Sequence, residues 1–190
     1  MEKLLFIKEL LHDFSGIGAI VPSSKYAARK MVEEIDFHSA DCIVEYGPGT
    51  GVFTEKILEK STKTEIVAIE NNNKFYKILQ NKFSDYNQLH LINGSAENID
   101  SYRNEYNISN IDYIISSLPF STLPGELTRV ILKKTSQQLS SGGNFITLMY
   151  SQIKLKLFQK YFDSIDFKRE FRNIPPAYII SCKNKAGEYN

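Results

Sequence analysis

An α/β fold with a mainly parallel sheet is predicted by two observations: β-rich runs alternate with helical segments, and a glycine-rich turn separates the first run from the helix after it. A third observation, two late β-rich runs in close succession, predicts that the sheet ends in a hairpin whose last strand is antiparallel. The chain has 190 residues and a hydrophobic fraction of 42%, which fits a single globular domain over 1–190.

Each expected element follows from its residue pattern. Five short runs of β-branched and other apolar residues predict parallel strands at 41–46, 65–70, 88–93, 111–116 and 143–149. The segments between them predict helices at 25–35, 51–60, 72–83 and 125–139. The two late runs cover 165–172 and 176–182, and Pro175 and Pro176 mark the short turn that joins them. We therefore expect seven strands with helices on both faces of the sheet.

Neither metal nor membrane-spanning chemistry is indicated by the composition. Cys42 and Cys182 lie in apolar runs, as small core residues do, and the three histidines, at 12, 38 and 90, have no zinc-site spacing. No apolar run approaches the roughly 18 residues that cross a bilayer, and the N-terminus lacks the features of a signal peptide. The sequence thus predicts a cytoplasmic protein without a metal site.

A glycine-rich loop follows the first expected strand and allows close backbone approach of a ligand. Its G-x-G-x-G spacing differs from the dinucleotide fingerprint G-x-G-x-x-G. An acid directly before the loop, Glu45, would repel a pyrophosphate but suits a cationic ligand. S-adenosylmethionine, with its ammonium and sulfonium groups, is such a ligand. The cofactor-binding residues expected in this segment are Glu45, Tyr46, Gly47, Gly49, Thr50 and Gly51.

Two further groups are expected at the same edge of the sheet, because the carboxyl ends of parallel strands lie together there. Glu70 ends the second strand and can accept hydrogen bonds from both ribose hydroxyls, with Asn71 beside it. Ser95 and Ala96 follow the third strand, where a small polar side chain and a backbone amide can bind adenine. Each signal is weak alone, but their order along the chain predicts an S-adenosylmethionine site.

The loop after the fourth strand is expected to touch both the methyl donor and the acceptor, which makes Ser116, Ser117, Leu118, Pro119 and Phe120 the candidate catalytic residues. Enzymes that methylate the adenine amino group carry Asn or Asp here, then Pro-Pro or Leu-Pro, then an aromatic that stacks on the base. The loop resembles that of the ribosomal RNA adenine dimethylases with serine in place of the amide. Ser116 is also expected to contact the cofactor.

A closer resemblance covers nearly the whole chain. The chain is similar to the bacterial soluble phosphatidylethanolamine N-methyltransferases, a group related to the adenine dimethylases. The segments that carry this resemblance are 6–11, 18–24, 45–54, 117–120 and 172–177. Two departures, Ser116-Ser117 where Ser-Gly is expected and Ser95 where an acid is usual, affect the acceptor more than the cofactor. The resemblance implies a Rossmann-like class I methyltransferase that modifies a lipid headgroup amine.

An extra N-terminal helix is expected at 2–14, where Leu4, Ile7, Leu11 and Phe14 share one face. In the resembled family such a helix reaches the membrane, which implies peripheral attachment to its inner face and a phospholipid substrate. The same face could instead pack on the core of the enzyme. We therefore interpret 1–22 either as a membrane-binding segment or, if it packs on the enzyme, as a lid.

Three other functions remain open: a ribosomal RNA adenine N6-methyltransferase, a small-molecule N- or O-methyltransferase, and a cofactor-binding protein without catalysis. Residues 151–190 hold eight Lys/Arg against four Asp/Glu, which either form a solvated helix face or suit phosphates of a membrane or of a nucleic acid, although a nucleic acid is the less favoured partner. A quaternary amine product would suit an aromatic wall, for which Phe120 is the first candidate, followed by Tyr26 and Tyr178.

Overall fold

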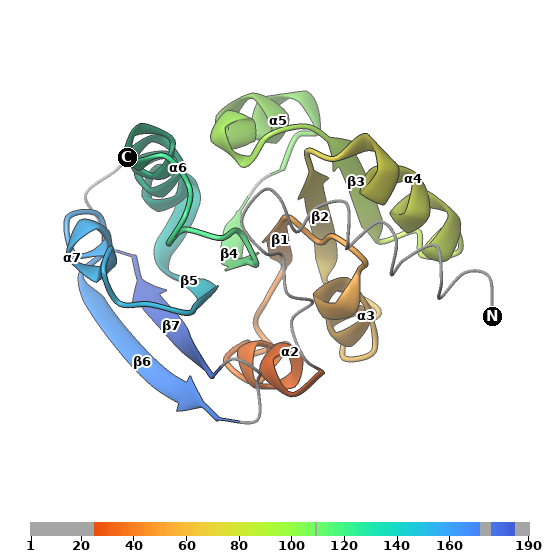
Figure 1. Ribbon diagram of the computed structural model, residues 1–190. Coiled ribbons are helices and arrows are strands. Elements are labelled where there is room, and N and C mark those ends of the chain that lie inside the picture. Colours follow the sequence, from red (N-terminus) through yellow and green to blue (C-terminus); the bar gives the residue numbers. More distant parts are fainter. Residues whose placement is uncertain (1–24, 109, 172–175, 185–190) are drawn as a thin grey trace.

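The computed structural model describes residues 25–108, 110–171 and 176–184 (Figure 1). The expected helix at 2–14, and the whole of segment 1–22, lie outside the described residues. Among the helices that are described, none is both long and apolar enough to cross a membrane.

Seven strands form one sheet in the order β3-β2-β1-β4-β5-β7-β6. The strands are β1 (Cys42–Tyr46), β2 (Glu65–Glu70), β3 (Leu89–Asn93), β4 (Ile111–Ser116), β5 (Leu139–Met149), β6 (Ser164–Glu170) and β7 (Ala177–Lys183). The first five are parallel, whereas β7 runs antiparallel to both of its neighbours, β5 and β6. This arrangement confirms the predicted sheet, including its antiparallel end. Strand β5 begins earlier than predicted because Leu139 already pairs with Ile111, before a register shift.

Helices cover both faces of the sheet (Figure 1). One set comprises α2 (Lys25–Val32), α3 (Val52–Leu58) and α4 (Asn73–Lys82). The other comprises the 3₁₀ turn η1 (Ala96–Asn98), α5 (Ile99–Glu105), α6 (Gly125–Gln138) and the short α7 (Leu155–Phe158). The sequence pattern did not predict α5 and α7, since both are too short to display a clear helical period.

Strand residues alternate between two core clusters, one on each face. In β1, Ile43 packs with α2 and α3, whereas Val44 and Tyr46 belong to the cluster on the α5–α6–α7 side. All five residues of β1 are buried. A strand covered on both faces reads as a continuous apolar run, which explains why its sequence shows no polar alternation.

The cluster on the α5–α6–α7 side contains a group of stacked aromatic rings. The rings of Phe145 and Phe162 stack with centroids 5.6 Å apart, and Phe120 meets Phe158 edge-on at 5.4 Å. Phe120 is 0% exposed. This corrects the expectation that Phe120 forms an aromatic wall for the acceptor, because its ring is packed inside the core and presents no open face. The ring packs against other phenylalanines instead.

Replacing Phe120 with alanine should lower the free energy of unfolding by about 3–5 kcal/mol, because it leaves a cavity among packed rings. Chemical denaturation of the purified protein measures the loss. The control is Ile153→Ala. Because Ile153 is 87% exposed, this substitution should change the free energy of unfolding by less than about 0.5 kcal/mol. A Phe120→Ala variant of unchanged stability would return this ring to the acceptor site.

Candidate active site

The glycine loop occupies the turn between β1 and α3, at the carboxyl edge of the sheet. Gly47 and Gly51 have φ angles of +67° and +79°, in the left-handed region that favours glycine. A Cβ atom on Gly51 would lie 2.5 Å from the Cε2 atom of Phe83, and one on Gly47 would lie 3.0 Å from Cδ2 of Leu118. Neighbours therefore hold the loop close on two sides, which fixes the path of its backbone.

The carboxylate of Glu70 ties the end of β2 to this loop. One oxygen, Oε2, accepts a hydrogen bond from the amide of Gly49 at 2.9 Å, and Oε1 accepts from the amide of Asn72 at 2.8 Å. Burial raises the pKa of Glu70, and the hydrogen bonds from these backbone amides oppose that rise. A carboxylate offers roughly four lone-pair sites, so sites remain for hydroxyl donors of a ligand.

Glu45 is a buried acid beneath the glycine loop, with 1% of its surface exposed. Its Oε2 accepts a hydrogen bond from Thr54 Oγ1 at 2.7 Å, while Oε1 has no partner within the described part of the chain. Burial raises the pKa of Glu45 to about 7. A cationic ligand in the loop would stabilise the charged form, so the unpaired oxygen fits the ammonium-bearing cofactor that the sequence predicts.

The end of β3 is joined to the same place. Both the amide of Gly94 and the side-chain nitrogen of Asn93 donate to the main-chain oxygen of Glu70, each at 3.0 Å. Ser95 follows in an extended conformation and makes no side-chain cap to η1, and Ala96 is buried. The turn expected to bind adenine therefore lies directly beside Glu70.

The loop after β4 is anchored to the glycine loop by Ser117. Ser117 Oγ donates to the main-chain oxygen of Gly47, and the amide of Ser117 donates to the oxygen of Tyr46 at 3.1 Å. Ser116 Oγ accepts from the amide of Leu118 at 3.2 Å. Ser117 therefore holds the loop after β4 against the glycine loop, whereas the hydroxyl of Ser116 accepts a hydrogen bond within its own loop.

Three tyrosines singled out in the sequence have rings that lie in other places than expected for ligand contact. Tyr46 is 0% exposed and its hydroxyl lies 3.3 Å from Thr135 Oγ1, so only its backbone faces the loop. Tyr26 is exposed on α2, and Tyr178 lies on β7 beside Phe167. The ring of Tyr46 belongs to the same core cluster as Phe120, and Tyr178 packs partly against that cluster.

Tyr150 is a residue of this edge that sequence reasoning missed. It directly follows β5, which pairs with β4 through Thr147 and Ser116. Its ring packs on the α2–α3 side, and its hydroxyl is buried without a hydrogen-bond partner among the described residues. As one of 11 tyrosines it carries no sequence signal, because only the strand order places it near the acceptor loop.

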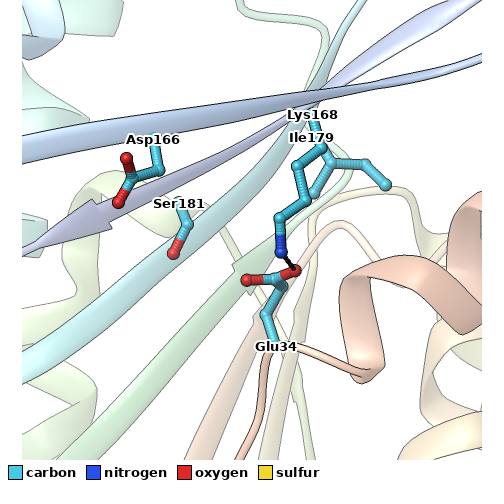
Figure 2. Close-up of a pocket in the computed structure, with 5 residues that line it drawn as sticks. All are labelled: Glu34, Asp166, Lys168, Ile179 and Ser181. Atoms are coloured by element: carbon cyan, nitrogen blue, oxygen red, sulfur yellow. Dashed lines mark hydrogen bonds and ion pairs between the residues drawn. The ribbon is translucent and has the colours of Figure 1, made fainter.

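A small pocket elsewhere lies between the end of α2 and strands β6 and β7 (Figure 2). Across it, Lys168 Nζ and Glu34 Oε1 form an ion pair at 2.6 Å, with Asp166 and Ser181 nearby. Its residues belong to none of the loops described above. Over the described ranges, no group of three or more acidic, histidine or cysteine side chains could hold a metal ion.

A sheet of this order, with a glycine loop after β1 and an acid ending β2, is the arrangement of the class I S-adenosylmethionine-dependent methyltransferases. Residues 23–168 match the family model of the ribosomal RNA adenine dimethylases, and the chain belongs to that family. It is therefore a methyltransferase that uses S-adenosylmethionine as its methyl donor.

Individual relatives differ in how much of their length is matched. The chain is 27% identical to an ornithine lipid N-methyltransferase of Singulisphaera acidiphila over 94% of both chains. It is 39% identical to ribosomal RNA small subunit methyltransferase A of a Sulfurihydrogenibium species, but that match covers 42% of this chain and 30% of the relative. The fold is also that of an S-adenosylmethionine-dependent O-methyltransferase from Thermotoga maritima, with a TM-score of 0.62 at 13% identity, covering 87% and 67% of the two chains.

Replacing Glu70 with alanine should weaken S-adenosylmethionine binding by about 100-fold, because it removes a charged hydrogen-bond acceptor and frees the amide of Gly49. Titration calorimetry measures the affinity. Glu65→Ala, at the opposite end of the same strand, is the matched control and should bind the cofactor normally. Equal affinity in the two variants would contradict the role of Glu70.

The stability of the ligand-free protein should depend on pH through Glu45. Its pKa is raised from 4.5 to about 7 in the folded state, so folding keeps a proton that the unfolded chain releases between these values. The free energy of unfolding should therefore fall as pH rises through this window. Glu45→Gln should remove this part of the decrease and gain stability relative to the parent at pH above about 7. Denaturation midpoints across this range measure it, and parallel profiles would contradict it.

Proposed function

We propose that this methyltransferase transfers methyl groups to the amine of a membrane lipid headgroup, such as that of phosphatidylethanolamine or an ornithine lipid. The observation that carries the proposal is the match to an ornithine lipid N-methyltransferase along 94% of both chains. The ribosomal RNA relatives are matched over about a third of their length, for example 34% in Borreliella burgdorferi.

The burial of Phe120 supports an acceptor other than adenine. An aromatic at this position stacks on the target base in enzymes that methylate adenine, but here the ring packs in the core. Ser116 and Ser117 stand where the base-binding amide is expected; the hydroxyl of Ser117 donates to Gly47, and that of Ser116 accepts from the amide of Leu118. A loop without an available amide or ring suits a small amine better than a planar base.

The cofactor is assigned to the edge formed by the first three strands. In this proposal Glu45 Oε1 faces the ammonium group, Glu70 accepts from the ribose hydroxyls, with Asn71 beside it, and the turn at Ser95 and Ala96 receives adenine. The remaining contacts come from the backbone at Tyr46, Gly47, Gly49, Thr50, Gly51 and Ser116. Once bound, the cofactor supplies an electrophilic methyl group on a sulfonium.

The acceptor amine is assigned to the loop after β4 and to Tyr150. No described residue donates a hydrogen bond to the main-chain oxygen of Ser117, which can therefore accept an N–H of a neutral amine. The buried hydroxyl of Tyr150 offers a second polar partner. Two contacts of this kind would orient the nitrogen lone pair toward the methyl group.

Access to the lipid is proposed through the N-terminal segment. In this scheme residues 1–190 act as one domain, and 1–22 either bind the inner face of the membrane or close over the site. The apolar face expected at 2–14 supports this proposal.

The direct test is transfer of labelled methyl from S-adenosylmethionine to vesicles. One set contains phosphatidylethanolamine, a second contains ornithine lipid, and a third contains only phosphatidylglycerol, which lacks an amine. Label in the lipid extract of the first or second set alone would support the proposal and identify the headgroup. Ribosomal RNA, the second candidate because of the family match over residues 23–168, serves as a parallel acceptor. Label in RNA and in no lipid would overturn the proposal.

Tyr150→Phe should lower kcat/KM for the lipid roughly tenfold, because it removes one hydrogen-bonding group from the acceptor. Cofactor affinity and the free energy of unfolding should stay unchanged, since no described residue pairs with this hydroxyl. Tyr113→Phe is the control: its hydroxyl accepts from the amide of Asp36 at the opposite edge of the sheet, and transfer should be normal. A loss of stability without a loss of transfer would make Tyr150 a structural residue.

A further inference from the structure

Aromatic and cationic side chains form a connected group on the two last strands of the sheet. Phe167 and Tyr178 meet edge-on with ring centroids 6.4 Å apart. The guanidinium of Arg169 lies 4.7 Å from the ring centre of Phe171 and 5.6 Å from that of Tyr178. We call these four residues the β6 aromatic cluster. The register pairs Arg169 with Tyr178, so β6 and β7 hold the cluster together.

The two phenylalanines of the β6 aromatic cluster are open to solvent. Phe167 is 54% exposed and Phe171 is 67% exposed. Phenylalanine has no polar tip, so two such rings at one end of an edge strand leave apolar surface that a partner could cover. Ile153, in the segment after β5, is also exposed, at 87%.

Positive charge accompanies this apolar surface. Arg169 lies over two rings of the cluster and forms no ion pair with a described residue. Lys168 differs, since it points to the other face and pairs with Glu34 (Figure 2). Exposed rings beside unpaired cations are the combination that binds an anionic bilayer surface, where rings enter the headgroup region and cations meet phosphates.

The cluster also lies at the edge of the sheet where the acceptor loop lies. Tyr178 pairs with Met149 at the carboxyl end of β5, and β5 in turn pairs with β4 where Thr147 meets Ser116. A surface bound by the cluster would therefore meet the same edge as the proposed methyl-transfer site. Exposed aliphatic Ile153 favours a lipid over RNA, because an aliphatic side chain does not stack on bases as a ring does.

We infer that the β6 aromatic cluster is a docking surface for an anionic membrane, separate from the N-terminal segment. This inference rests on the proposed lipid substrate. Phe167 and Phe171 insert among headgroups, and Arg169 binds lipid phosphate while stacked on Phe171 and Tyr178. Docking here brings the edge that carries the acceptor loop to the bilayer, so that headgroup amines are supplied from the surface.

The test uses the full chain and vesicles of phosphatidylethanolamine and phosphatidylglycerol, compared with vesicles of phosphatidylcholine alone. The double variant Phe167→Ser/Phe171→Ser should lose about tenfold in vesicle partitioning, and Arg169→Gln should lose the preference for anionic vesicles. Methyl transfer to vesicle lipid should fall in parallel. Transfer to the same lipid dispersed in detergent should remain normal, because no bilayer is then needed. Unchanged cofactor affinity checks that each variant is folded.

A matched control replaces exposed rings elsewhere. Tyr86 and Tyr106, which follow α4 and α5 in the chain, are 43% and 42% exposed. The double variant Tyr86→Ser/Tyr106→Ser should leave vesicle binding unchanged. Equal losses in the control, or normal vesicle binding in the Phe167/Phe171 variant, would overturn the inference. The inference would also be overturned if the Phe167/Phe171 variant kept vesicle binding but lost binding to ribosomal RNA, or lost self-association measured by light scattering.

The two proposals fail separately. If the parent protein methylates detergent-dispersed lipid while the Phe167/Phe171 variant binds vesicles normally, the docking surface is wrong and the lipid substrate stands. If the parent binds vesicles through this cluster but methylates no lipid in either form, the docking surface stands and the proposed substrate is wrong.

Discussion

The rest of the site depends on one buried carboxylate at the end of β2. Glu70 accepts hydrogen bonds from Gly49 in the glycine loop and from Asn72 at the start of α4, and its main-chain oxygen accepts from Gly94 after β3. The ends of three adjacent strands are thereby joined through one residue. Removing this carboxylate would leave the amides of Gly49 and Asn72 without their acceptor, so the same side chain that is assigned to the ribose hydroxyls also stabilises the folded loop.

Hydrogen bonds of a single residue also position the loop after β4, which is the proposed acceptor loop. Ser117 binds the backbone of both Gly47 and Tyr46, so the loop after β4 is attached to the loop that surrounds the cofactor. Methyl transfer requires donor and acceptor to meet in line at short range. In the proposed site, the direct hydrogen-bonded connection between the two loops would provide that alignment, and the buried hydroxyl of Tyr150 would add a polar group from the end of the neighbouring strand.

Family membership and acceptor chemistry are separate questions here. The chain belongs to the ribosomal RNA adenine dimethylase family, yet the aromatic residue of its acceptor loop is a core residue packed on Phe158 and Phe145. A fold of this kind hosts many acceptors, so the substrate has to be argued from the site. The buried ring, the serines and the exposed rings on β6 all support an acceptor presented by a membrane.

The sequence by itself determined the strand and helix alternation, the antiparallel end of the sheet, the glycine loop and the acid at position 70, because each depends on local periodicity or on a short motif. It could not determine which way a ring points: Phe120 follows a motif that suggested an open aromatic wall, and tertiary packing placed it in the core. It could not single out Tyr150 or the β6 aromatic cluster either. Residues distant in sequence become neighbours only through strand order and register, and those are set by the burial of both faces of the sheet.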